Sequence, residues 1–239
     1  MVIQTALNPL PERFDIKAGN LKTLPDSICN FPSLTKLKLC CKMLKSLPDN
    51  ISNLGLLEKL EINGSPITTL PESIGKLPSL IGLFLIDTKI KTLPYSICNL
   101  AKLEKICLLH CTALESLPDC IGKLPSLKKL YIRGGKITTL PESIGDIATL
   151  TVLQLQYTNI ANLPPSIGNL SNLVSLGVYN FETGDIVKTN DFDVFYGDFH
   201  DEDTKKRSPF KSLPSTALKL VSLENLNLNN TEVSELPDF

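Results

Sequence analysis

Apolar residues recur along the chain in units of nearly constant length. A Leu-Pro dipeptide marks each unit at the same phase. Nine such markers follow one another at spacings of 23, 23, 23, 24, 23, 23, 50 and 23 residues, from Leu24 to Leu236. Other apolar positions keep fixed distances from the marker, as Leu60 and Ile62 do ahead of Leu70. A repeat of this length indicates one small structural unit used many times.

The spacing of apolar residues changes within each unit. Ahead of the marker it is two residues, as between Leu60 and Ile62, which predicts a short β-strand. Behind the marker it is three to four residues, as in Ile74, Leu77 and Leu80. This spacing predicts a short helical or 3₁₀ segment that begins at the proline, whose missing N–H is not needed in a first turn.

A single unit is too small to fold by itself, because its few apolar side chains do not offset the entropy lost when its backbone is ordered. Stacked units share strand hydrogen bonds and cover both sides of each apolar layer. The pattern therefore predicts an α/β solenoid with parallel strands on its inner face and helical turns on its outer face.

The consensus of the units, LxxLxLxx(N/T/C)xIxxLPxSIGxLxxL, resembles the leucine-rich repeat. Residues 80–94 and 103–118 are similar to units of plant nucleotide-binding immune receptors. Ras-scaffolding repeat proteins, their plant Ras-group-related relatives and secreted bacterial effectors use the same unit. The resemblance covers about residues 12–179 and 213–239. It implies a curved solenoid with a parallel β-sheet on its concave face and short helices or 3₁₀ turns on its convex face.

We expect a single leucine-rich-repeat domain over residues 1–239. The 50-residue spacing between Leu163 and Leu213 departs from the period and indicates an inserted segment that lacks the leucine pattern. The expected divisions are a partial capping repeat (1–24), regular repeats of 23 or 24 residues (25–179), an insertion (about 180–212) and a last repeat (213–239).

The inserted segment has a composition of its own. Loops of this length are usually functional or disordered. Its aromatic residues are interspersed with aspartates, which favours either docking onto a partner or packing against the base of the loop itself. The aromatic residues are Phe192, Phe195, Tyr196 and Phe199.

One column of the units departs from the family pattern. Five positions before the marker leucine, or six in the 24-residue unit, leucine-rich repeats usually carry an asparagine that bonds the backbone of adjacent turns. Most units here have shorter hydroxyl or thiol side chains, and Lys42 and Gly135 leave backbone groups that need other partners. The column contains Lys42, Ser65, Thr88, Cys111, Gly135, Thr158 and Thr231.

The outward positions of the predicted strands carry the candidate binding residues, because alternate side chains of a strand point to opposite faces. The apolar and aromatic residues at these outward positions, from Phe84 to Tyr179, are expected to form an exposed cluster about 20 Å long. It serves either as a docking surface or as a seat for the insertion. A basic column beside it serves either solubility or the binding of an anionic surface. The candidate partner-binding residues are Phe84, Ile86, Leu109, Tyr131, Tyr157 and Tyr179, with Lys59, Lys105, Lys129 and Arg133 from the basic column.

The charge and cysteine content narrow the classes of partner and compartment. Lys and Arg number 24 and Asp and Glu 25, a net charge of −1, so we expect neither nucleic acid nor a membrane as partner.

The chain shows no CxxC pair and no export signal at its start. We therefore expect an intracellular, cytoplasmic chain with reduced thiols, or one in the host cytosol if it is a secreted bacterial effector. Cys29 and Cys98 share a column three units apart, too far for a disulfide, and are expected to be small buried hydrophobes.

Catalytic and metal-binding patterns are not found in the sequence. It carries no P-loop, GxSxG, HExxH or kinase signature. Cys107, His110 and Cys111 are residues of metal-ligand type, but strand alternation separates them and the chain has only two histidines. We expect no enzyme activity, no cofactor and no metal.

Together these patterns predict a non-catalytic module that binds a protein partner on its concave face. The similarity to immune-receptor and effector repeats implies recognition in host defence or its subversion by a bacterium. Two alternatives stay open. One is a substrate-recruiting component of a ubiquitin ligase or other multi-chain enzyme, and the other is a sensor of a phosphorylated ligand that uses the basic column. The sequence does not fix the oligomeric state, and we expect a monomer.

Overall fold

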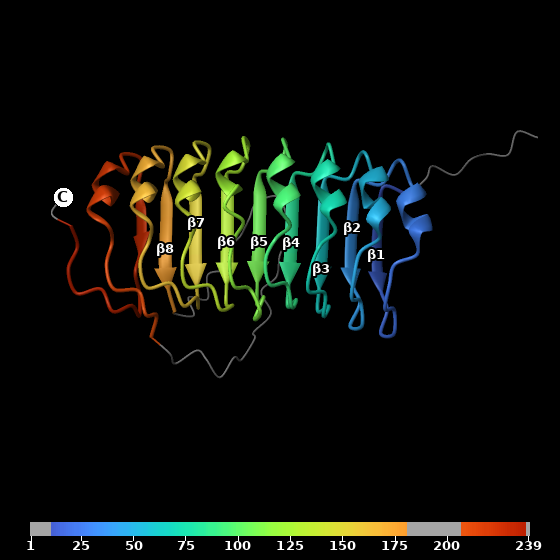
Figure 1. The fold of residues 1–239 in the computed structure, drawn as a ribbon, viewed down its shortest axis with the longest axis horizontal. Helices are drawn as coiled ribbons and strands as arrows, with labels where there is room; N and C mark the ends of the chain where they lie inside the picture. The colour runs from blue at the N-terminus through green and yellow to red at the C-terminus, as the bar shows by residue number, and fades with distance from the viewer. Residues whose placement is uncertain (1–10, 181–206, 238–239) are drawn as a thin grey trace, which may run out of the picture.

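Within the part of the chain that the structure describes, nine parallel strands form one sheet in sequence order, which confirms the predicted solenoid. The computed structural model describes residues 11–180 and 207–237. Figure 1 shows the strands side by side, with the helical turns in a second layer. The strands are β1 (Arg13–Lys17), β2 (Lys36–Cys40), β3 (Lys59–Asn63), β4 (Gly82–Ile86), β5 (Lys105–Leu109), β6 (Lys129–Arg133), β7 (Val152–Gln156), β8 (Ser175–Tyr179) and β9 (Asn225–Asn227).

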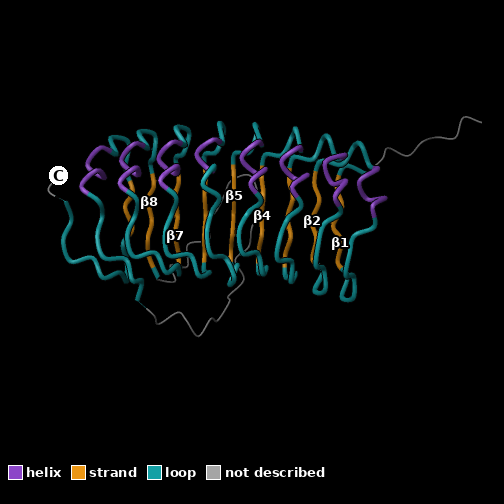
Figure 2. Tube along the Cα trace, in the orientation of Figure 1, coloured by secondary structure: helices purple, strands orange, loops and turns teal. Residues whose placement is uncertain are grey.

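Short 3₁₀ helices follow the Leu-Pro markers, as the sequence predicts. In η3 (Glu72–Lys76), the N–H of Ile74 donates to the carbonyl oxygen of Pro71 at 3.0 Å. Figure 2 shows these helices, in purple, as a layer separate from the strands. The other 3₁₀ helices of the described residues are η1 (Asp26–Asn30), η2 (Asp49–Asn53), η4 (Tyr95–Asn99), η5 (Ile121–Lys123), η6 (Glu142–Asp146), η7 (Pro165–Asn169) and η9 (Ser215–Lys219).

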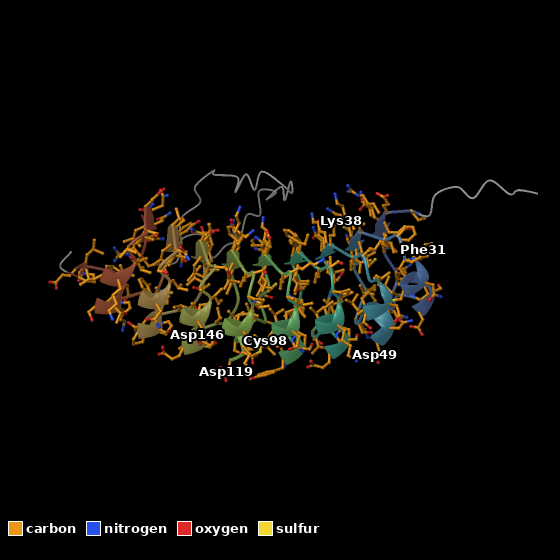
Figure 3. The ribbon with its side chains drawn as sticks, turned by 90° about the horizontal axis from the view of Figure 1, so that it is seen from above. Phe31, Lys38, Asp49, Cys98, Asp119 and Asp146 are labelled. Atoms are coloured by element: carbon orange, nitrogen blue, oxygen red, sulfur yellow. A yellow bond between two sulfur atoms is a disulfide. The ribbon has the colours of Figure 1, made fainter. Side chains whose placement is uncertain are left out.

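The repeated leucine positions form one continuous core between the sheet and the 3₁₀ layer. The two inward residues of β3, Leu60 and Ile62, are fully buried in it. Figure 3 shows the strands on the inner side of a shallow arc and the 3₁₀ helices on its outer side. This arrangement turns the alternate residues of every strand towards the concave face.

The repeat pattern resumes a few residues before the Leu213-Pro214 marker. Phe210 lies within the range assigned to the insertion, yet it is fully buried in the main core. It stands three residues before Leu213, the position that Ile67 occupies before Leu70. The N–H of Lys211 also donates to the carbonyl oxygen of the preceding unit's Ala161 at 2.9 Å. The aromatic and acidic residues expected at the centre of the insertion lie outside the described residues.

A disulfide joins Cys98 to Cys120 across two adjacent units, with the Cα atoms 5.9 Å apart. The expectation that Cys98 is an unpaired buried thiol is therefore wrong. That expectation compared cysteines in one column, whereas the bond joins different columns of neighbouring units. Cys29 is free and buried, as predicted.

The same two columns touch in other units along the outer face. Cys98 is the fifth residue after its marker leucine, and Cys120 is the third after the next one. At these positions in other units, a Cβ added to Gly75 would clash with the backbone oxygen of Ser96, and one added to Gly145 with that of Ser166. The disulfide thus occupies a contact that requires glycine in the units of Gly75 and Gly145. We call this fifth-to-third contact the seam.

Candidate functional site

The strand register brings outward-facing cations into one row across the sheet. Lys36 pairs with Lys59, and Lys105 with Lys129, as the repeat phase predicts. Adjacent strands lie about 4.8 Å apart, so these side chains are near neighbours. We call this row, which Gly82 interrupts, the cation row, and it consists of Arg13, Lys36, Lys59, Lys105 and Lys129.

The outward apolar residues form a cluster separate from the main core. We call it the concave cluster, and it consists of Phe84, Ile86, Cys107, Leu109 and Tyr131. The expectation that these residues are exposed is wrong, because Phe84 is 0% and Tyr131 7% exposed. Their predicted side of the sheet is correct, but strand alternation does not reveal what lies above a side chain. Sequence reasoning also left Cys107 out, although it stands between Phe84 and Tyr131 in the register.

The Phe84 ring occupies the gap that Gly82 leaves in the cation row. A Cβ at Gly82 would lie 2.7 Å from Cε2 of the ring. The Nζ atoms of Lys59 and Lys105 lie 4.6 and 5.4 Å from the centroid of the same ring. Lys105 Nζ also lies 5.3 Å from the Tyr131 centroid. These cation–π contacts hold two ammonium groups over the concave cluster.

Tyr157 and Tyr179 are not members of the concave cluster, which they were expected to extend. Tyr157 follows β7 with a positive φ of 52°, so it leaves the alternation of the strand. The guanidinium carbon of Arg133 lies 5.2 Å from the Tyr157 ring centroid. Tyr179 ends β8 and is buried. The structure therefore divides the candidate residues into a central cluster and a second group at the carboxyl ends of the strands.

Glu61 adds a carboxylate to this largely basic face. Its oxygens lie 2.6 Å from Lys38 Nζ and 3.1 Å from Lys59 Nζ, and the residue is 6% exposed. The hydrogen bond from Lys38 to Glu61 raises the pKa of that lysine. Glu61 thereby helps to fix Lys59 beside the Phe84 ring.

Burial keeps the ionisable members of the concave cluster neutral. Loss of solvent raises the pKa of Cys107 to about 12 and that of Tyr131 to about 12. Because the thiolate is the nucleophilic form of cysteine, Cys107 is chemically inert at physiological pH. Among the described residues, no group of three or more His, Cys, Asp or Glu side chains is placed to hold a metal ion.

Positive and negative charges separate between the two faces. Acidic residues begin several 3₁₀ helices, including Asp49 in η2 and Glu142 in η6. Figure 3 shows Lys38 on the sheet side and Asp49, Asp119 and Asp146 on the outer side, where Cys98 also lies. A nearly neutral chain thus gathers an excess of positive charge on its concave face.

The helices within 11–180 and 207–237 are all too short or too polar to cross a membrane.

Comparisons with known sequences identify the repeat. The family model described as the leucine-rich repeat region matches residues 60–134 and 119–188, which together span more than half of the chain. A search of curated proteins found no match.

Solved structures share the fold. The leucine-rich repeat domain of the type III effector XopL is 30% identical, with a TM-score of 0.59, and the match covers 64% of this chain and 56% of that domain. The ectodomain of the Arabidopsis thaliana receptor kinase GASSHO1/SCHENGEN3, in complex with CASPARIAN STRIP INTEGRITY FACTOR 2, is 20% identical with a TM-score of 0.63. That match covers 91% of this chain and 25% of the receptor chain. The functional domain of InlJ from Listeria monocytogenes, which includes a cysteine ladder, is 21% identical with a TM-score of 0.58 over 71% of this chain and 35% of that one. This chain therefore spans about half of the XopL domain and a smaller part of the other two.

Proposed function

The chain belongs to the leucine-rich repeat family, and from that premise we propose that it is a non-catalytic interaction module whose concave face binds an acidic surface of a protein partner. The cation row is the observation that carries this proposal. Like charges that stand directly opposite in a sheet destabilise it. Lys105 and Lys129 form such a pair. An acidic partner surface that lay across the row would be attracted to its exposed and partly exposed members Lys36, Lys59 and Lys129.

The concave cluster supports this binding face from below. Its aromatic rings are buried, and so is Lys105, so the partner meets Lys36, Lys59 and Lys129 before it meets Phe84 or Tyr131. The cation–π contacts of Lys59 and Lys105 restrict the freedom of these side chains. Less side-chain entropy is then lost when the partner binds. The proposed site therefore includes these buried residues as the packing layer beneath the lysines: Phe84, Ile86, Leu109 and Tyr131.

The proposed biological setting is recognition between host and pathogen, either by an immune-type receptor or by a secreted bacterial effector. The likeness to the XopL repeat domain supports this setting by analogy. In this proposal the protein acts inside a cell, in the cytoplasm or the host cytosol.

Charge reversal in the cation row tests the proposal. The tagged protein is used to capture partners from a lysate of a plausible host, and the affinity for the recovered partner is then measured at low and high salt. Lys36→Glu combined with Lys129→Glu is expected to weaken binding about tenfold at low salt. Both lysines are at least partly exposed, so the variant is expected to fold.

The matched control is Lys76→Glu combined with Lys123→Glu, which makes the same change in net charge on exposed lysines of the 3₁₀ layer. Equal binding by both double variants, or affinity that does not change with salt, would show that the cation row does not bind the partner.

A further inference from the structure

A polar cavity opens at the carboxyl ends of β5, β6 and β7, beside the concave cluster. It has a volume of about 270 Å³. We propose that this cavity is a binding site for an oxyanion, namely the phosphoryl group of a small phosphate monoester or of a phosphorylated side chain. This site is separate from the cation row and does not require the partner proposed above.

Two consecutive glycines make room for the cavity. In each of three neighbouring units, the residue after the strand has a positive φ: 54° at His110, 78° at Gly134 and 52° at Tyr157. In the middle unit the following residue, Gly135, also has a positive φ, of 96°. The middle unit therefore carries no side chain where its neighbours carry two, and His110, Tyr157 and both glycines line the resulting space.

The lining of the cavity is positively charged. Arg133, Lys136 and Arg207 contribute three permanent cations, and none of the described lining residues is Asp or Glu. The contact of Arg133 with the Tyr157 ring, at 5.2 Å, restricts its guanidinium group. Such a concentration of cations is notable in a chain whose net charge is −1. Arginine is well suited to phosphate because its planar group donates two parallel hydrogen bonds to an oxyanion.

A buried hydroxyl group is available inside this charged lining. Thr158 is 2% exposed, lines the cavity, and its Oγ1 atom has no hydrogen-bond partner among the described residues. The other hydroxyl groups of this column have partners: Ser65 Oγ donates to the carbonyl oxygen of Cys41 at 2.8 Å, and Thr231 Oγ1 to that of Leu228 at 2.8 Å. Thr88 Oγ1 lies 3.3 Å from Cys111 Sγ. A buried hydroxyl without a partner is unfavourable. A change of the Thr158 rotamer towards the cavity would let a phosphoryl oxygen accept its hydrogen bond.

The size of the cavity limits the ligand. Sites for drug-sized molecules usually exceed about 300 Å³. A cavity of about 270 Å³ fits a phosphoryl group with a short carbon substituent better than a nucleotide. A phosphorylated serine or threonine side chain and a small sugar or glycerol phosphate share this chemistry.

Titration of the whole chain with inorganic phosphate, followed by NMR or calorimetry, tests the proposal. We expect saturable binding that Lys136→Gln combined with Arg207→Gln weakens about tenfold. Lys76→Gln combined with Lys123→Gln removes the same charge from the 3₁₀ layer and is expected to leave the binding unchanged. A short peptide with one phosphoserine and glycerol 3-phosphate form two further arms, and the tighter of the two identifies the source of the phosphoryl group.

Thr158→Val separates a binding role from a structural one. Valine has nearly the same shape as threonine and removes a hydroxyl that has no partner in the described structure, so thermal stability should be unchanged or higher. Phosphate binding should nevertheless weaken several-fold. Three outcomes would overturn the proposal: no saturable binding of any of the three probes, equal weakening by both charge variants, or unchanged binding by Thr158→Val. These variants leave Lys36 and Lys129 intact, so this result is independent of the partner experiment.

Discussion

Gly82 determines where the Phe84 ring lies, and through that ring it determines where two lysines lie. The ring fills the space above the glycine, and Lys59 and Lys105 contact it from neighbouring strands. Strand alternation predicted from the sequence that Phe84 points away from the main core. It did not predict burial, because burial depends on how side chains of adjacent strands lie over one another.

Substitution of Gly82 by alanine should disturb this packing. The added Cβ would approach Cε2 of Phe84 to 2.7 Å, and the ring is fully buried, so it cannot move aside freely. We expect a loss of about 1–3 kcal/mol in the free energy of unfolding, measured with urea.

Gly55→Ala is the matched control for this residue, since a Cβ there meets nothing within 4 Å. It should be neutral or slightly stabilising. If both alanine variants unfold at the same urea concentration, the Phe84 ring is not confined by Gly82 as described.

At the scale of the elements, strands and 3₁₀ helices were predictable because each depends on local spacing. The two apolar residues of β3 and the proline before η3 are sufficient to place those elements. The disulfide was not predictable in the same way. It depends on which columns of adjacent units touch. The sequence indicates this contact only indirectly, through units that carry glycine five residues after one marker leucine and serine three residues after the next.

The Cys98–Cys120 disulfide should stabilise the outer layer. It closes a loop with a sequence separation of 22 residues, for which the chain-entropy model gives about 3 kcal/mol. Cys98→Ala should lower the free energy of unfolding by about this amount more than Cys29→Ala does. Cys29 is the matched control, because it is a buried cysteine of the same column that forms no cross-link.

Thiol counting provides the direct check of this bond. Denatured protein without reductant should show five reactive thiols of the seven cysteines, and seven after reduction. If protein isolated from its native compartment shows seven reactive thiols before reduction, the Cys98–Cys120 bond is absent there, and the expected reducing environment is supported.

For the whole molecule, buried thiols make stability sensitive to alkaline pH. Burial raises the pKa of Cys107 to about 12 and that of Cys111 to about 11, from 9.0 in the exposed state. The unfolded chain therefore releases these protons near pH 9, whereas the folded chain retains them. Since the folded state binds more protons above pH 9, stability is complete below that pH and falls as the pH rises towards 11 to 12.

We expect unfolding at pH 10 to require less free energy than at pH 7.5, by about 1.4 kcal/mol for each of the two thiols. Urea titrations at the two pH values measure this difference. Cys107→Ala should reduce the difference by one thiol's share. A difference that is the same in this variant would mean that Cys107 ionises in the folded protein as readily as in the unfolded chain.

The seam between units restricts how such a molecule can grow. A unit with glycine at the fifth position after its marker leucine, such as Gly75, accepts a successor with serine at the facing position. The unit with Cys98 accepts a successor with Cys120. Duplication of a glycine-and-serine unit would therefore lengthen the array with both new junctions intact. A duplication that separated the two cysteines would leave a thiol facing a serine and would remove the covalent link between neighbouring units.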